Sequence, residues 1–203
     1  GGFGIPQRAL DQQRCGLVMG APGKIRRFAG AEGGLAAVEF AFLLPVMITM
    51  FFGVVELSMA INCRSAVTNV ASTAADLTAQ SRTISTSDMS NVFNAASAIL
   101  YPYDTSPAKI TVSSVIYDTA TKSLTAGKVA WSCAWNGTAR NPNDTVTLPS
   151  GLMTANGSVI VAEITYSYSS PTTKIITGPM AMANTFYAKP RRVAQITGPS
   201  SCP

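Results

Sequence analysis

The longest apolar run in the chain lies at residues 35–55, LAAVEFAFLLPVMITMFFGVV, and Glu39 is its only charged residue. A helix rises about 1.5 Å per residue, so a run of this length crosses the hydrocarbon core of a bilayer, which is about 30 Å thick. The run therefore predicts a transmembrane helix. A carboxylate inside such a helix is costly, which makes Glu39 a candidate functional residue.

The helical pattern continues beyond the apolar run. Residues 56–80 contain no glycine or proline, and apolar side chains recur there at spacings of three and four, at Ile61, Val67, Val70, Ala74 and Leu77. This spacing predicts one helix over residues 35–80, with its membrane part at about residues 35–56 and an amphipathic outer part. A second helix is expected at residues 88–100, with Ser87 as its N-cap and Pro102 just beyond its end.

The remainder of the chain has the composition of β-strands. Residues 109–117, 128–135, 158–169 and 182–187 are rich in β-branched and aromatic side chains, whereas residues 136–151 hold the turn-forming pairs of a loop. These patterns predict an α+β fold in which the long helix packs on a small antiparallel β-sheet. The expected organisation is a leader at residues 1–34, the helix at 35–80 and an outer domain at 81–203.

Charge indicates how the predicted helix is oriented. Residues 1–34 carry five basic and two acidic side chains, and the whole chain has a net charge of +5. By the positive-inside rule the leader is expected in the cytoplasm and the residues after the span outside it. No basic patch with interleaved aromatic residues follows the leader, so nucleic acid is not an expected partner.

The cysteines and the missing histidines limit the chemistry. With no histidine and no Cys-x-x-Cys pair in the chain, neither a metal site nor a cofactor is predicted. The acidic residues outside the span show no paired spacing, which indicates a protein that is not an enzyme. If the predicted topology holds, Cys133 and Cys202 share an oxidising compartment, where either a disulfide or two unpaired thiols are possible.

Several residues form a candidate processing and assembly site. Gly34 stands at the cytoplasmic edge of the span, where a membrane peptidase could cleave the Gly34–Leu35 bond. The new amine of Leu35 would then lie near Glu39 and pair with its carboxylate, on the same chain or on a neighbouring subunit. Pro45 predicts a kink or is simply tolerated. Glu56 either reaches the outer interface or pairs with Arg64 or another subunit.

This arrangement resembles the prepilin cleavage signal, in which glycine precedes the cut and glutamate is the fifth residue of the mature chain. Here these residues are Gly34, Leu35 and Glu39, and Phe40 completes a Glu-Phe pair. The wider stretch, EGGLAAVEFAFLLPVMITMFFGVVELSMAINCR, resembles the TadE/TadG-like family of tight-adherence (Tad, or Flp) pilus assembly proteins, most closely TadE. The C-terminal part fits the family pattern more loosely, with alternating aromatics at residues 163–168 and Pro190-Arg191-Arg192 near the end.

The resemblance implies a minor pilin or pseudopilin, processed by a prepilin peptidase and held in the bacterial inner membrane with its C-terminal domain outside. Its expected partners are that peptidase, other Tad pilin or pseudopilin subunits and the assembly platform. A place in the fibre and a place in the platform are both open. The alternative is an uncleaved single-pass anchor that carries an extracytoplasmic binding module.

Overall fold

The computed structural model describes residues 32–170 and 178–203, so the predicted leader falls almost entirely outside the described residues. The fold is α+β, as predicted. The chain divides into two compact units, residues 1–50 and residues 51–203. In chain order the helices and strands are α2 (Glu32–Ala79), α3 (Thr86–Ala98), β1 (Lys109–Tyr117), β2 (Ala126–Trp135), β3 (Thr145–Thr147), β4 (Ser158–Tyr168) and β5 (Met180–Ala188).

Helix α2 covers the predicted range and begins three residues earlier than expected. Within residues 51–203, its inward face consists mostly of small and β-branched residues at helical spacing. Val67, Val70 and Ala74 are buried as predicted, whereas Ile61 and Leu77 are exposed by 57% and 36%. The small alanines of this face allow the helix backbone to approach the sheet closely, which is how an alanine-rich helix contributes to a core.

Helix α3 begins earlier in the chain than its N-terminal signals predict. Its N-cap is Ser85, not Ser87, because Ser85 and Asp88 form a capping box: the Ser85 hydroxyl accepts from the Asp88 N–H, and the Asp88 carboxylate accepts from the Ser85 N–H. Asp88 is therefore the third helical residue and not the first. The Ser85 hydroxyl also donates a 2.7 Å hydrogen bond to the Asp88 carboxylate, and this bond, together with the one from the Ser85 N–H, holds the pKa of Asp88 below its usual value. The helix ends at Ala98, before the Tyr101–Pro102 bond.

The five strands form one antiparallel sheet in the order β3-β2-β1-β4-β5. Four of them lie at the predicted segments, and β1 has the predicted bounds. Strand β3 was not predicted, because its three residues lie in the segment expected to be a loop. Ala130 is an extra residue in β2 opposite Ser114 and Val115 of β1, and this bulge allows the odd-numbered Val129 and Cys133 to face opposite sides of the sheet.

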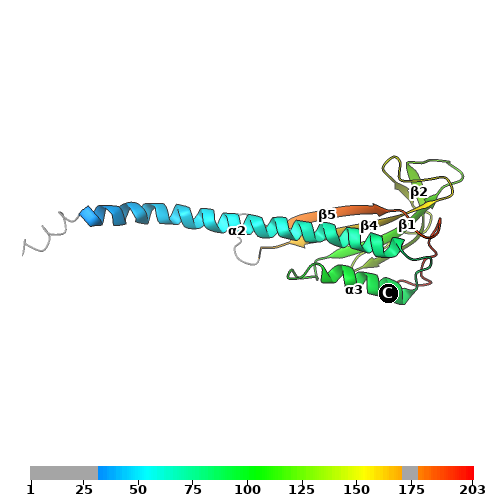
Figure 1. Ribbon diagram of the computed structural model, residues 1–203, viewed down its shortest axis with the longest axis horizontal. Helices are drawn as coiled ribbons and strands as arrows, with labels where there is room; N and C mark the ends of the chain where they lie inside the picture. The colour runs from blue at the N-terminus through cyan, green and yellow to red at the C-terminus, as the bar shows by residue number, and fades with distance from the viewer. Residues whose placement is uncertain (1–31, 171–177) are drawn as a thin grey trace, which may run out of the picture. The chain divides into compact units, whose positions relative to one another are not determined.

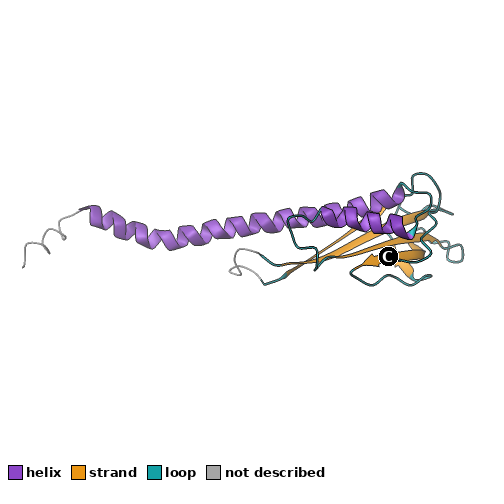
Figure 2. Ribbon diagram, turned by 90° about the horizontal axis from the view of Figure 1, so that it is seen from below, coloured by secondary structure: helices purple, strands orange, loops and turns teal. Residues whose placement is uncertain are grey.

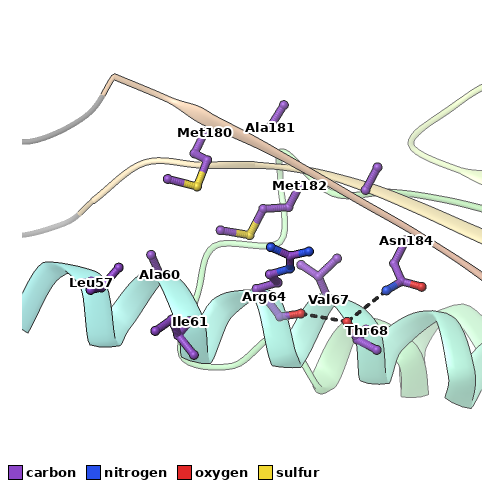
Figure 3. Close-up of a pocket in the computed structure, with 11 residues that line it drawn as sticks. Leu57, Ala60, Ile61, Arg64, Val67, Thr68, Met180, Ala181, Met182 and Asn184 are labelled. Atoms are coloured by element: carbon purple, nitrogen blue, oxygen red, sulfur yellow. Dashed lines mark hydrogen bonds between the residues drawn. The ribbon is translucent and has the colours of Figure 1, made fainter.

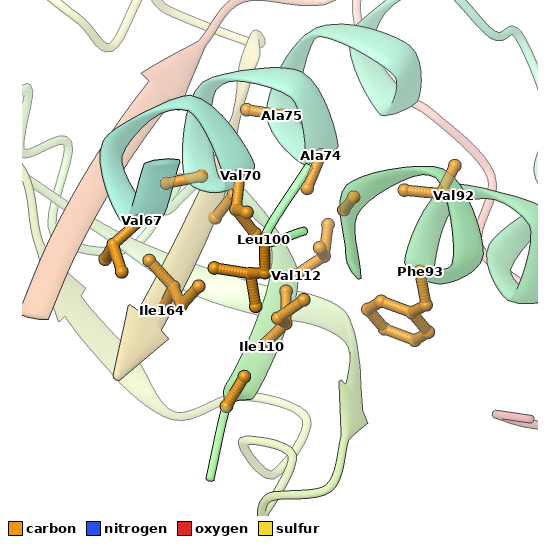
Figure 4. Close-up of a cluster of buried hydrophobic side chains, with 14 of the residues drawn as sticks. Val67, Val70, Ala74, Ala75, Val92, Phe93, Leu100, Ile110, Val112 and Ile164 are labelled. Atoms are coloured by element: carbon orange, nitrogen blue, oxygen red, sulfur yellow. The ribbon is translucent and has the colours of Figure 1, made fainter. Parts of the chain in front are cut away.

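Both helices cover the same face of the sheet, which Figure 2 shows. The core between the helices and the sheet is apolar: Phe93 of α3, Ile110 and Val112 of β1 and Ile164 of β4 are almost completely buried with the inward face of α2 (Figure 4). A second, smaller cluster lies on the opposite face of the sheet around Val115, Val129, Val146, Leu148, Met153, Val159 and Val161.

Candidate functional site

The first part of α2 has the surface expected of a membrane span. Among the described residues, α2 is the one helix long and apolar enough to cross a membrane, and the apolar stretch that qualifies it is not buried by the rest of the protein. Phe42, Met50 and Phe51 expose 64–77% of their side chains. So many exposed large apolar residues require a covering of lipid or protein.

The predicted processing residues lie at the start of this helix. Because α2 begins at Glu32, the Gly34–Leu35 peptide bond lies in its first turn and not just before it. The first N–H groups of a helix have no intrahelical partner, and glycine is a poor helix former, so this turn is the least costly one to unwind. A Cβ atom placed on Gly34 would have no heavy atom within 4 Å. Glu39 and Phe40 are both exposed, one turn further along.

The two further assembly candidates differ in their surroundings. Pro45 lies within α2, and its carbonyl accepts a 2.8 Å hydrogen bond from the Thr49 hydroxyl; its predicted kink stays a prediction. Glu56 is only 4% exposed. Its carboxylate lies close enough to Tyr168 to contribute to the raised pKa of that phenol. The expected position of Glu56 at the outer interface stays a prediction. A role for Glu56 in pairing with another subunit stays a prediction.

Residues 34–76 match a family model described as TadE-like protein. The chain therefore carries a TadE-like segment. The match begins at Gly34, includes the whole predicted span and ends at Asp76, near the end of α2. It confirms the family resemblance deduced from the sequence, and all five strands lie beyond it. No curated protein and no solved structure matches the chain significantly.

The TadE-like segment contributes a buried thiol to a tyrosine cluster. Burial raises the pKa of the Cys63 thiol to about 11 and that of Tyr166 to about 12. Burial also raises the pKa of Tyr168, with smaller contributions from Cys63 and Glu56 and an opposing one from a hydrogen bond with Ser170. These groups stay protonated at neutral pH, so Cys63 is not an activated nucleophile.

Two tyrosine hydroxyls in this cluster tie separate elements together. Tyr103 donates a 3.0 Å hydrogen bond to the Met59 carbonyl of α2, and Tyr166 donates a 2.9 Å bond to the Asp104 carbonyl. The rings of Tyr103 and Tyr168 meet edge to face, with 6.1 Å between their centres. The cluster thus fixes the loop between α3 and β1 against α2, and its role is structural.

A groove of about 350 Å³ separates the TadE-like helix from the edge strand β5. In Figure 3, Arg64 reaches from α2 toward β5 beside Met182. Leu57 and Ile61 form the more apolar end of the groove, and a 3.0 Å hydrogen bond from Asn184 to Thr68 crosses it at the other end. This is called the α2–β5 groove below. Sequence patterns did not predict this groove, because its two walls lie far apart in the chain.

Strand β5 presents an unguarded sheet edge beside this groove. Its sequence, MAMANTFYA, has no charge and no proline, and its pairing with β4 runs from Met180 to Ala188 without a bulge. Proteins commonly protect an exposed edge with a charged residue, a proline or a bulge, or they keep the edge strand short. The three-residue β3 at the opposite edge is such a short strand. The β5 edge is therefore able to pair with a further strand.

The C-terminal tail is held against β2 and α3. Cys133 of β2 and Cys202 form a disulfide, with 5.4 Å between their Cα atoms. The indole N–H of Trp131 donates a 2.9 Å bond to the Ile196 carbonyl, and Thr86 donates a 2.7 Å bond to the Ser201 carbonyl. Within residues 32–170 and 178–203 no group of His, Cys, Asp or Glu side chains is arranged to hold a metal ion.

Proposed function

We propose that this TadE-like protein is a minor pilin or pseudopilin of a Tad (Flp) pilus or a related secretion machinery. In this proposal a prepilin peptidase cuts the Gly34–Leu35 bond, and the mature chain takes part in pilus assembly from the bacterial inner membrane. The observation that carries the proposal is the position of Glu39: it is the only charged residue of the apolar run, and it would be the fifth residue of the mature chain.

The proposed topology places the leader in the cytoplasm and residues 57–203 outside the inner membrane. Two independent features support it. The basic side chains gather before the span. The Cys133–Cys202 disulfide lies after the span, as expected of a domain in an oxidising compartment.

A role in assembly, without a catalytic step, agrees with the surfaces of the protein. The exposed apolar helix and the unguarded β5 edge are both surfaces that a neighbouring subunit could cover. The expected partners are the prepilin peptidase, other Tad pilin or pseudopilin subunits and the assembly platform.

Intact mass and N-terminal sequencing of the membrane form, from cells with and without a prepilin peptidase, test the proposal. We expect a mature chain that begins at Leu35 only where the peptidase is present. Gly34→Val should block the cut, and Gly33→Val is the matched control one residue upstream. A chain that stays uncut in cells containing the peptidase would indicate the anchored binding module instead.

A further inference from the structure

Four exposed apolar side chains lie on α2 or beside it, immediately after its predicted span. Leu57 and Ile61 on α2 are 62% and 57% exposed, Tyr101 in the loop after α3 is 86% exposed, and Met180 at the start of β5 is 39% exposed. Figure 1 shows that the loop after α3 and the start of β5 both lie at the end of the domain from which residues 51–56 of α2 lead away. These four residues are called the proximal patch.

Hydrogen bonding, ring contact and strand pairing hold the proximal patch at one level along α2. Tyr103, two residues after Tyr101, donates its hydroxyl hydrogen to the Met59 carbonyl. Met180 pairs in the sheet with Tyr168, whose ring contacts that of Tyr103. Met180 also lines the α2–β5 groove together with Leu57 and Ile61. The loop, the strand and the helix therefore meet around residues 57–61.

This level corresponds to the headgroup layer of a bilayer. Counted from Val55, the last residue of the predicted span, a rise of about 1.5 Å per residue places Leu57 about 3 Å, Met59 about 6 Å and Ile61 about 9 Å further out. The headgroup layer on each side of the hydrocarbon core is about 5–8 Å thick. Leu57 and the Tyr103–Met59 contact thus fall inside the layer, and Ile61 falls at its outer boundary.

We propose that the proximal patch is a lipid-contact surface, seated in the headgroup layer on the outer side of the membrane. The inference rests on the proposed function, because it needs residues 35–55 to span the bilayer. Tyrosine favours this layer, since its ring is apolar and its hydroxyl remains hydrated. Leu57, Ile61 and Met180 would contact the lipid headgroups, and Leu57 also the upper ends of the acyl chains, so the domain would stand directly on the membrane instead of at a distance on its helix.

Spin labels on the full chain in nanodiscs of phosphatidylethanolamine and phosphatidylglycerol test this inference. The background carries Cys15→Ser and keeps the fully buried Cys63, and the unmodified background reports any labelling of Cys63. Tyr101→Cys places a label in the patch, and Met180→Cys places another while leaving Tyr101 intact. Leu124→Cys is the matched control, an apolar residue 51% exposed in the loop between β1 and β2.

The quantity measured is the accessibility of each label to oxygen, which enters lipid, relative to a nickel chelate, which remains in water. We expect this ratio to be severalfold higher at Tyr101 and Met180 than at Leu124, and lower than at Met47→Cys within the span. Ratios at both patch positions equal to that at Leu124, with Met47 in lipid, would overturn the inference and leave the proposed function intact. Low accessibility to both reagents would indicate a protein partner and overturn it as well. An aqueous Met47 would instead overturn the membrane span.

Discussion

The side-chain amide of Asn184 donates a 3.0 Å hydrogen bond to the hydroxyl of Thr68. Thr68 donates its own hydrogen to the Arg64 carbonyl one turn earlier on α2, at 3.1 Å, so the hydroxyl both donates and accepts (Figure 3). This pair is a direct polar link between the edge strand β5 and the TadE-like helix. It sets the separation of the two walls of the α2–β5 groove.

Asn184→Ala is expected to lower the free energy of unfolding by about 1 kcal/mol, because a partly buried hydrogen bond is lost and the Thr68 hydroxyl keeps its other bond. Urea unfolding of the full chain in detergent, followed by tryptophan fluorescence, measures the change. Thr185→Ala is the control, since Thr185 is the exposed neighbour and points to the opposite face of the sheet. An equal loss in both variants would contradict a specific role for the link.

Gly198→Ala is expected to destabilise the protein by roughly 1–3 kcal/mol through overpacking. A Cβ atom on Gly198 would lie 2.2 Å from Cγ and 2.4 Å from Cδ1 of Trp131. The ring cannot retreat easily, because its N–H is bonded to the Ile196 carbonyl. The tail should therefore lift from the sheet, with a shift in tryptophan emission. Gly178→Ala, where an added Cβ meets nothing within 4 Å, should leave both stability and emission unchanged.

Stability should fall in alkaline solution because of the buried Cys63 thiol. Its pKa rises from 9.0 to about 11 on folding, since burial disfavours the thiolate. Below pH 9 both states keep the proton and the contribution is fully present. Between pH 9 and about 11 the unfolded chain loses the proton first, so this contribution declines with pH. The loss of unfolding free energy between pH 8 and pH 10 should therefore be smaller in Cys63→Ala than in the native chain. An equal loss in both proteins would contradict this account.

Sequence patterns predicted the elements whose signals lie within the element itself. They missed features that depend on contacts with other parts of the chain. Strand β1 has the predicted bounds because a β-branched run is set between a proline-containing loop and Asp118. The start of α3 was misplaced because Ser85 and Ser87 are both good N-caps, and only the position of Asp88 as the third helical residue distinguishes them. Strand β3 is too short to show any periodicity and is defined by its pairing with β2.

The same distinction applies to the candidate site. Gly34, Glu39 and Phe40 lie within one short stretch, so their spacing was visible in the sequence and agrees with the extent of the family match. The burial of Glu56 was not predictable, because it depends on packing near Tyr168, on a strand that comes much later in the chain. The α2–β5 groove was missed for the same reason.

Cys202→Ser is expected to lower the free energy of unfolding by about 4 kcal/mol in the chain-entropy view, because the disulfide closes a long loop in the unfolded state. The two cysteines are separated by 69 positions in the sequence. Urea unfolding with and without reductant measures this: the native chain should lose stability on reduction, and the variant should not respond. Equal stability of the oxidised native chain and the variant would contradict a stabilising role for the disulfide.

Glu39→Gln tests the assembly role assigned to the charge within the span. The substitution preserves the size of the side chain and removes the carboxylate that is proposed to pair with the amine of Leu35. Cleavage at Gly34–Leu35 should continue, because the glycine and the weak first turn of α2 are unchanged. Leaving one charge of a buried pair without its partner costs about 3–5 kcal/mol, so the mature variant should co-purify with its partner subunits more than tenfold less than the native chain. Glu39→Asp keeps the charge and should restore part of the interaction. Co-purification of the glutamine variant at the native level, with normal cleavage, would show that the carboxylate of Glu39 is needed neither for processing nor for binding the partner subunits.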